Sequence, residues 1–328
     1  MFRDTRHIHL VAIGGIGMSG IAEVLLNLGF RVSGSDLRDT AVTQHLRDLG
    51  ARVDIGHDAD QVAGSDVVVY SSAVTEANPE IQAARQRRIP VIRRADMLAE
   101  LMRLKHGIAV AGSHGKTTTT SLVAAVLGHG GLDPTVIVGG KVLAIGSNAR
   151  LGRGEYLVAE ADESDGSFTC LTPTIAVVTN IDLEHVDFYP DLEHLRGAFT
   201  RFLARVPFYG TAILCQDDAE VRALAARLDR KVITYGLNPE AQVRAEPAAG
   251  PADRHQAAAV WAYGEALGEL RLPLRGRHNL RNALAAVAVG LELGLPFARI
   301  AEGLDGFAGV GRRCESHGEH GGVLVLDD

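Results

Sequence analysis

Two glycine-rich loops, each between an apolar run and a helical pattern, restrict the folds open to this chain. The first loop, Gly15–Gly20, has the spacing G-x-G-x-x-G and follows the apolar run His7–Ile13. The second loop, Gly112–Thr118, follows the apolar run Gly107–Ala111. A loop of this kind, between a strand and a helix, holds phosphate at the helix N-terminus. The sequence therefore predicts an α/β protein with two phosphate-binding loops, an arrangement that would bring a nucleotide-linked substrate to ATP.

The first hundred residues alternate between strand and helix patterns. The three consecutive valines within Asp66–Ser71 are typical of a parallel strand that is buried on both faces. This alternation predicts an N-terminal, Rossmann-like, doubly wound domain over residues 1–104. The expected strands are His7–Ile13, Arg31–Ser35, Asp66–Ser71 and Pro90–Ile92, and the expected helices are Ser19–Leu28, Val42–Leu49, Asn78–Arg87 and Ala95–Arg103.

A second α/β unit begins near Lys105, and we predict a central domain of the P-loop ATPase type over residues 105–311. Residues 243–275 combine a Pro/Gly-rich turn with alternating polarity, which indicates a small antiparallel excursion. The run Gly322–Leu326 indicates one more strand, either added to an existing sheet edge or opening a further domain at residues 312–328. The other expected strands are Ile108–Ala111, Tyr156–Glu160, Ile175–Thr179, Ala212–Cys215 and Lys231–Tyr235, and the helices are Thr117–Leu127, Leu192–Arg205, Ala219–Leu228 and Asn279–Leu293.

The composition limits the class of protein. Hydrophobic residues make up 46% and charged residues 22% of the 328 residues, as in a soluble globular protein. The net charge of −7 gives no basic footprint for nucleic acid, and no apolar run reaches membrane-spanning length. The spacing of Cys170, Cys215 and Cys314 matches neither a metal site nor a disulfide framework. We therefore expect a cytoplasmic protein with reduced thiols, and neither nucleic acid nor membrane insertion.

The second glycine-rich loop has the chemistry of an ATP-type phosphate loop. Lys116 supplies positive charge for phosphate, and the hydroxyl of Thr117 suits Mg²⁺. The strict pattern requires glycine where this chain has Val110, but the shorter form Gly-x-x-Gly-Lys-Thr still follows a strand and opens a helix. A glycine-rich turn with an exposed lysine is the alternative. The candidate ATP-binding residues of the loop are Gly112, Ser113, His114, Gly115, Lys116, Thr117 and Thr118.

The first glycine-rich loop has two interpretations. Asp36 follows the second expected strand, where NAD(P)-dependent oxidoreductases have a ribose-binding acid. A turn or capping role for Asp36 is the alternative, and no recognisable hydride-transfer site follows in the chain. Ser71 and Ser72 end a neighbouring strand and would face the same crevice. The candidate ligand-binding residues of this unit are Gly15, Gly17, Gly20, Asp36, Ser71 and Ser72.

Acidic residues follow two strands of the second unit. Glu160 ends the first of these strands, where a carboxylate beside a phosphate loop can complete the coordination of Mg²⁺. His185 lies among carboxylates after the next strand, a position suited to a second cation or a phosphoryl group. A purely structural role for His185 is the alternative. A solvated acidic loop is the alternative interpretation for Glu163 and Asp165.

The segment Arg277–Asn282 opens the last strong helical pattern. His278 and Asn282 are four residues apart and therefore share one helix face. Their polar groups are suited to reading the edge of an adenine base. A simple helix cap at Asn279 is the competing interpretation of this segment.

Taken together, these motifs resemble those of the Mur ligase family, the ATP-dependent enzymes that build the peptide stem of peptidoglycan. The pairing of Gly-Ile-Gly-Met-Ser-Gly with Glu-Ala-Asp-Glu-Ser-Asp fits the alanine-adding branch better than the later ligases or the murein-tripeptide recycling ligase. The matching stretches are Ile13–Gly20, Val32–Asp36, Ser71–Val74, Gly112–Thr120, Glu160–Phe168, Asn180–Asp182, Gly276–Asn282 and Gly309–Arg313.

The resemblance implies two ligands and a binding place for each. The N-terminal domain would hold the UDP of UDP-N-acetylmuramate on Gly15–Gly20. The central domain would hold ATP, with His278 and Asn282 in contact with the adenine. The residues near the UDP would be Asp36, Ser71 and Ser72.

The resemblance also implies a mechanism. Lys116 would neutralise the β- and γ-phosphates of ATP, Thr117 and Glu160 would bind one Mg²⁺, and Glu160 with His185 would bind a second. The lactyl carboxylate would attack the γ-phosphate, and the amine of L-alanine would then displace phosphate from the acyl phosphate. A carboxylate is a poor acyl donor until phosphorylation gives it a leaving group, and the cations stabilise the charge at the transferring phosphoryl group.

Members of the family continue into a third, Rossmann-like domain, which supplies the amino-acid site and part of the ATP site. This chain ends at Asp327-Asp328, so the resemblance implies that the third domain is essentially missing. We expect the 328 residues to bind UDP-N-acetylmuramate and, weakly, ATP, with little ligase activity of their own. A noncatalytic nucleotide-binding module and an NAD(P)-dependent oxidoreductase are the alternatives.

Overall fold

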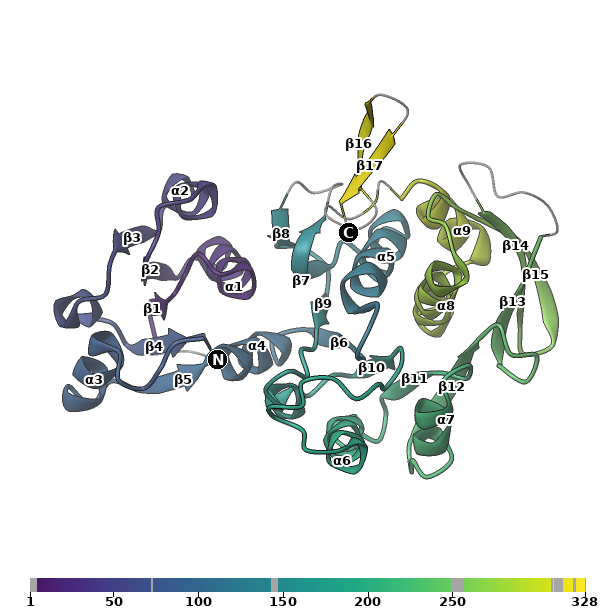
Figure 1. The fold of residues 1–328 in the computed structure, drawn as a ribbon, viewed down its shortest axis with the longest axis horizontal. Coiled ribbons are helices and arrows are strands. Elements are labelled where there is room, and N and C mark those ends of the chain that lie inside the picture. The colour runs from purple at the N-terminus through teal and green to yellow at the C-terminus, as the bar shows by residue number, and fades with distance from the viewer. Residues whose placement is uncertain are drawn as a thin grey trace.

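The computed structural model describes residues 5–71, 73–142, 147–248, 256–307, 309, 315–320 and 323–327. Two large sheets follow one another along the chain, with helix α4 between them (Figure 1). The first sheet has five parallel strands in the order β3-β2-β1-β4-β5. Its strands are β1 (His7–Val11), β2 (Arg31–Asp36), β3 (Arg52–Ile55), β4 (Val67–Tyr70) and β5 (Val91–Arg93). The strand order reverses between β1 and β4, so the predicted doubly wound topology is confirmed.

Helices cover both faces of the first sheet. Ile8 and Leu10 of β1 join the hydrophobic cluster that contains α1, whereas Val11 packs with Val62 and Ala84 in a smaller cluster. All five residues of β1 are buried, and its two histidines, His7 and His9, make side-chain hydrogen bonds within the unit. The helices are α1 (Ile16–Asn27), α2 (Ala41–Asp48), α3 (Pro79–Gln86) and α4 (Arg94–Met102), and η1 (Ala59–Val62) is a 3₁₀ turn.

A network of buried polar side chains lies within this first unit. Both carboxylate oxygens of Glu80 are engaged, and the side chain is 0% exposed. His9 Nε2 lies 2.5 Å from one oxygen, and His57 Nδ1 lies 2.6 Å from the other. The Ser35 hydroxyl donates to Glu80 at 2.7 Å, and the Ser33 hydroxyl lies 2.8 Å from His9 Nδ1. The network connects α3 to β1 and β2. Its side chains satisfy one another's hydrogen-bonding groups, which the backbone hydrogen bonds of the sheet would leave without partners.

The second sheet has ten strands in the order β15-β14-β13-β12-β11-β10-β6-β9-β7-β8. The strands from β13 to β7 in this order pair in parallel, and the pairs β13–β14, β14–β15 and β7–β8 are antiparallel. The predicted antiparallel excursion over residues 243–275 is therefore confirmed. The strands are β6 (His106–Ala111), β7 (Thr135–Val142), β8 (Ser147–Arg150), β9 (Tyr156–Glu160), β10 (Ile175–Val178), β11 (Thr211–Cys215), β12 (Lys231–Gly236), β13 (Val243–Pro247), β14 (Gln256–Ala262) and β15 (Glu265–Leu272).

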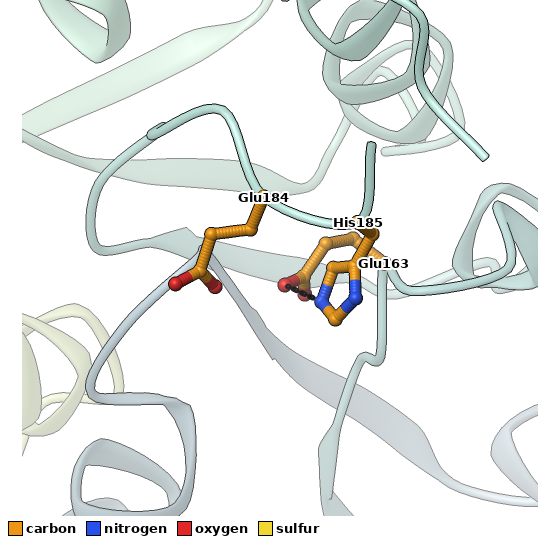
Figure 2. A group of neighbouring side chains, drawn as sticks. All are labelled: Glu163, Glu184 and His185. Carbon is orange, nitrogen blue, oxygen red and sulfur yellow. Dashed lines mark ion pairs between the residues drawn. The ribbon is translucent and has the colours of Figure 1, made fainter. Parts of the chain in front are cut away.

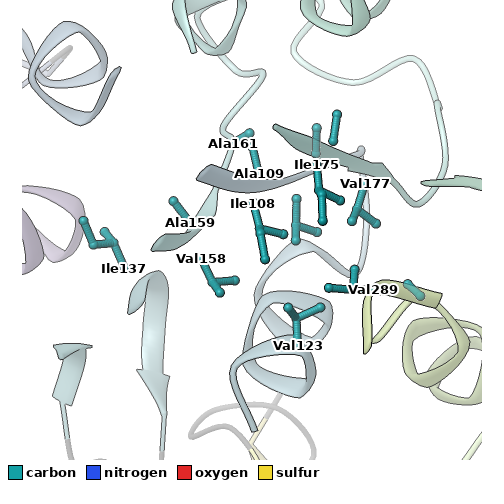
Figure 3. Packing of buried hydrophobic residues seen from close by; sticks show 14 of the residues in the cluster. Ile108, Ala109, Val123, Ile137, Val158, Ala159, Ala161, Ile175, Val177 and Val289 are labelled. Carbon is teal, nitrogen blue, oxygen red and sulfur yellow. The ribbon is translucent and has the colours of Figure 1, made fainter. Parts of the chain in front are cut away.

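The centre of the second sheet is buried by helices on both faces. Helix α5 (Lys116–His129) packs against α8 (Arg277–Glu292) and α9 (Phe297–Asp305) on one face. Val123 and Val289 of these helices meet Ile108 and Val177 of the strands (Figure 3). On the other face lie α6 (Leu192–Leu203), α7 (Ala219–Ala225) and the short turn η2 (Ser167–Cys170). Helix α1 of the first unit packs against β7 and β8, so the two units are in contact.

The last described strands form a separate two-stranded sheet. Strand β16 (Glu315–His320) pairs antiparallel with β17 (Val323–Asp327). The prediction of a strand near residues 322–326 is confirmed. The alternative that this strand extends an existing sheet edge is wrong, because its partner is β16 in a separate sheet. Cys170 and Cys215 are free thiols, and Cys314 lies outside the described residues. The domain boundaries at residues 104 and 311 stay predictions.

Candidate functional site

The second glycine-rich loop connects β6 to α5 in a shape that only glycine adopts without strain. Gly112 has φ of 138° and Gly115 has φ of 80°, both in the region that side chains disfavour. Gly115 is the N-cap of α5, and as a glycine it has no side chain that could cap the first turn. The backbone N–H groups of the first turn are therefore directed at whatever ligand the loop holds, as in phosphate-binding loops.

The loop after β10 fixes the shape of this phosphate loop through hydrogen bonds. The Thr179 hydroxyl donates to the His114 carbonyl at 2.6 Å, and the Asn180 side chain both accepts from the His114 N–H at 2.8 Å and donates to its carbonyl at 3.0 Å. Ser113 Oγ lies 2.9 Å from both the N–H and the carbonyl oxygen of Asp182. Ser113 and His114, two predicted ATP-binding residues, therefore orient the loop backbone in this structure.

Replacing Gly112 with alanine is expected to lower the free energy of unfolding by about 1–3 kcal/mol. The added Cβ would lie 2.0 Å from Thr179 Oγ1, at a backbone φ that alanine disfavours. Gly128→Ala in α5 is the matched control, because a Cβ there would meet nothing within 4 Å. Urea denaturation of both variants tests this, and an unchanged midpoint for Gly112→Ala would contradict it.

Lys116 lies at the start of α5 with its ammonium turned back onto its own loop. Nζ donates to the Gly112 carbonyl at 2.7 Å, to the Ser113 carbonyl at 3.2 Å and to Glu163 Oε1 at 2.8 Å. The side chain of Lys116 is 14% exposed and that of Glu163 is 1% exposed. The charge predicted for ATP phosphates is therefore paired with a buried carboxylate in this structure.

Thr117 and Glu160, the residues predicted to share one Mg²⁺, lie together. Glu160 ends β9, which pairs directly with β6, and Val110 of β6 is its register partner. The Thr117 hydroxyl lies 3.1 Å from each carboxylate oxygen of Glu160. A hydroxyl and a carboxylate at this separation fit the oxygen ligands that Mg²⁺ prefers.

His185 lies beside Glu163 and Glu184 (Figure 2). His185 Nε2 is 3.6 Å from Glu163 Oε1, and one ligand atom from each of the three residues lies within 4.8 Å of the others. His185 has φ of 54°, an unusual conformation for a side-chain-bearing residue and one that occurs at functional sites. We call Glu163, Glu184 and His185 the acidic cluster.

The alternative of a solvated loop is wrong for Glu163, because its side chain is buried. Burial raises the pKa of Glu163 above its usual value, although the neighbouring Lys116 charge opposes that shift. Tyr189 covers the same segment and donates its hydroxyl to the Glu163 carbonyl at 2.7 Å. Burial and the negative charge of Glu163 raise the pKa of Tyr189 to about 12, so the phenol keeps its proton.

The segment at the start of α8 approaches the phosphate loop. Asn282 is 8% exposed, and a Cβ added at Gly115 would lie 2.8 Å from its Oδ1. His278 is exposed and lies over Gly276, where an added Cβ would be 2.6 Å from its Cε1. The competing expectation of a cap at Asn279 is wrong, because α8 begins earlier and its N-cap is Gly276.

The first glycine-rich loop is shorter than predicted, because α1 begins at Ile16 rather than at Ser19. Gly17 and Gly20 therefore lie in the helix, and Gly15 is the N-cap without a side-chain hydrogen bond. Asp36 Oδ2 accepts from the Gly14 N–H at 2.8 Å, so this carboxylate fixes the turn before the helix. Ser72 lies outside the described residues.

A cleft of about 280 Å³ is lined by residues of both units, from the N-terminus of α1 to the end of β9. Arg94, at the start of α4, crosses the cleft, and its Nη2 lies 3.4 Å from Asp162 Oδ2. Gly17 makes room for this arginine, because a Cβ there would be 2.6 Å from Arg94 Nη1. Sequence reasoning missed Arg94, since no local motif marks it. The lining includes Gly15, Gly17, Ser71, Arg94, Glu160 and Asp162.

Within the described part of the chain, no helix is long and apolar enough to cross a bilayer. Residues 7–106 match the family described as "Mur ligase family, catalytic domain", and residues 110–290 match "Mur ligase middle domain". The first match covers the five-stranded sheet, and the second covers the phosphate loop, the acidic cluster and most of α8.

Relatives and solved structures agree with these matches. The UDP-N-acetylmuramate–L-alanine ligase of Desulfotalea psychrophila is 57% identical over 329 residues, which cover 100% of this chain and 72% of the relative. The enzyme of the same name from Syntrophobacter fumaroxidans is 55% identical and is covered to 70%.

Among solved structures, the UDP-N-acetylmuramate-alanine ligase of Thermotoga maritima aligns with a TM-score of 0.84 at 34% identity, over 98% of this chain and 74% of that one. A UDP-N-acetylmuramate:L-alanyl-γ-D-glutamyl-meso-diaminopimelate ligase from Neisseria meningitides aligns with a TM-score of 0.85 at 29% identity, over 94% and 100%. Both family models, the relatives and the solved structures with the same fold are all Mur ligases. This chain therefore belongs to the Mur ligase family.

Proposed function

We propose that this chain provides the UDP-substrate and ATP sites of a ligase that joins L-alanine to the lactyl carboxylate of UDP-N-acetylmuramate, a step of peptidoglycan biosynthesis. The observation that carries the proposal is the cleft that links the first glycine-rich loop to Glu160. A diphosphate on the N-terminus of α1 would extend its sugar toward the Thr117–Glu160 pair. The names of the relatives support this choice of substrates.

The residues of the second unit fit ATP and Mg²⁺. The uncapped N-terminus of α5 offers backbone N–H groups, and Lys116 offers a cation within the same loop. Thr117 and Glu160 would hold Mg²⁺, with His185 near a second position. Asn282, which contacts the loop, is proposed to lie along the adenine edge, with His278. Bound Mg²⁺ supplies positive charge at the transferring phosphoryl group.

The proposed reaction has two steps, and each forms one bond between heavy atoms and breaks one. A lactyl carboxylate oxygen bonds to the γ-phosphorus of ATP, and ADP leaves. The amine nitrogen of L-alanine then bonds to the acyl carbon, releasing phosphate and a proton. Lys116 and the N-terminus of α5 orient the triphosphate, and Gly15 with the N-terminus of α1 orients the UDP end. We propose a cytoplasmic location, because the reaction consumes ATP.

The noncatalytic module and the NAD(P)-dependent oxidoreductase are not favoured by the relatives, all of the reported ones being ligases. The 328 residues correspond to 72% of the Desulfotalea relative, and the family resemblance puts the amino-acid site in the remaining part. The activity test therefore needs a fusion of this chain to the C-terminal part of that relative. We call this protein the fusion ligase.

We expect the fusion ligase to release ADP when it is given UDP-N-acetylmuramate, L-alanine, ATP and Mg²⁺, and the 328 residues alone to release little. Turnover by the 328 residues alone would place the amino-acid site within them and contradict our assignment. Binding of both nucleotides without turnover by the fusion ligase would favour a noncatalytic module. Binding of NADH in preference to UDP-N-acetylmuramate would favour an oxidoreductase.

A further inference from the structure

The ammonium group of Lys116 is paired with the buried carboxylate of Glu163. Lys116 Nζ is 2.8 Å from Glu163 Oε1, and its other contacts are the carbonyls of Gly112 and Ser113 in its own loop. A lysine held in this way must leave Glu163, or share it, to contact a triphosphate. Nucleotide binding therefore changes the surroundings of a buried carboxylate.

Glu163 is held in place and is incompletely satisfied. Its carbonyl accepts from the Tyr189 hydroxyl at 2.7 Å and from the Gly166 N–H at 2.9 Å, which fixes the backbone. Its side chain is 1% exposed, and Oε2 has no hydrogen-bond partner within the part of the chain that the structure describes. A buried carboxylate oxygen without a partner is unfavourable, so it indicates a further ligand at this position.

The surroundings of Glu163 identify the chemistry of that ligand. Glu184 and His185 each place a ligand atom within 4.8 Å of the Glu163 carboxylate (Figure 2). Two carboxylates and an imidazole form a donor set for a divalent cation. Without Lys116 or a cation, the buried Glu163 carboxylate would repel the half-buried carboxylate of Glu184.

We propose that Glu163 is a positioning residue that couples the two ligands of the site. It holds Lys116 against the phosphate loop in the nucleotide-free chain, and it becomes a cation ligand with Glu184 and His185 when Lys116 turns to the triphosphate. The inference rests on the proposed function, because it requires ATP at the loop. Each ligand then tightens the binding of the other, since the cation replaces the charge that Lys116 withdraws.

The test is the effect of a cation on nucleotide affinity in the 328-residue chain. A fluorescent ATP analogue is titrated with EDTA and, separately, with Mn²⁺, for the unaltered chain and for Glu163→Gln. Glu163→Gln frees Lys116, so we expect metal-free affinity to rise about tenfold and the enhancement by Mn²⁺ to fall about tenfold. The intrinsic complexation of Mn²⁺ by the analogue is the same for both chains and cancels in the comparison.

Three further variants make the result specific. Glu193→Gln is the control, because Glu193 is 81% exposed and pairs with Arg196. In a Lys116→Met background, Glu163→Gln is expected to leave metal-free affinity unchanged, because Glu163 acts there through Lys116. His185→Asn, at a side chain that is 39% exposed, is expected to reduce the Mn²⁺ enhancement and leave metal-free affinity unchanged.

The outcomes separate this inference from the proposed function. If Glu163→Gln weakens binding equally with and without Mn²⁺, or changes neither, Glu163 is only structural and the inference is overturned. If Glu163→Gln fails to fold, His185→Asn decides, and an undiminished Mn²⁺ enhancement in that variant overturns the inference. If the unaltered chain binds no nucleotide under either condition, the ATP site itself, and with it the proposed function, is overturned.

Discussion

Replacing Lys116 with methionine is expected to lower kcat of the fusion ligase by about 10³-fold. Lys116 lies in the loop at the N-terminus of α5, where the proposed function places the charge that develops on the transferring phosphoryl group. Methionine is also unbranched and only one atom shorter than lysine, and it removes the charge. ADP release at saturating substrates gives kcat, and urea denaturation of the same variant shows how far the loss of the Glu163 partner affects folding.

Lys231→Met is the matched control for this prediction. Lys231 also pairs with a carboxylate, since Nζ lies 2.7 Å from Glu292, but it is 58% exposed and lies at the start of β12. We expect kcat of Lys231→Met to stay near that of the unaltered fusion. A folded Lys116→Met variant with more than a tenth of the original kcat would show that the loop acts without its lysine.

Replacing Glu80 with alanine is expected to lower the free energy of unfolding by about 3–5 kcal/mol. The substitution removes the acceptor shared by His9, His57 and the Ser35 hydroxyl, and it leaves those groups buried without their partner. Glu80→Gln keeps the volume of the side chain but offers fewer hydrogen-bond acceptor positions. We therefore expect its free energy of unfolding to lie between those of Glu80→Ala and the unaltered chain. Urea denaturation at neutral pH gives the free energy of unfolding of the unaltered chain, Glu80→Ala and Glu80→Gln.

Glu76→Ala is the control for Glu80→Ala because it lies just before the same helix. Glu76 pairs with Arg85 at the surface and is 68% exposed, so its removal should leave the denaturation midpoint unchanged. If Glu80→Ala unfolds at the midpoint of Glu76→Ala, the buried network does not stabilise the first unit.

Local sequence patterns predict the centres of both sheets because those strands are buried on both faces. The valines of β4 and the run Ile175–Val178 of β10 are apolar throughout, as their full burial requires. The Thr117–Glu160 pair is also predictable, since Glu160 ends β9 and Thr117 lies in the first turn of the helix that follows the neighbouring parallel strand β6. Glycine and proline after Leu293 predict the end of α8.

The remaining features depend on contacts between distant segments. Strands β3 and β8 have mixed polarity and are short, so no period distinguishes them from loops. Glu163 stands in an acidic run typical of a solvated loop, and only Lys116 and Tyr189, brought there by the fold, explain its burial. Arg94 of the first unit pairs with Asp162 of the second, which no local pattern predicts. The choice of alanine as the substrate rests on the family resemblance alone.

The contact between Asn282 and Gly115 has a consequence for the synthesis of this protein. The phosphate loop is translated early, but the side chain that lies against it belongs to α8, which the ribosome makes much later. A nascent chain that has reached α7 contains the whole phosphate loop and the side chains that hydrogen-bond to the loop backbone, but it lacks Asn282. The proposed nucleotide site is therefore completed late in translation, after the whole five-stranded sheet has been synthesised.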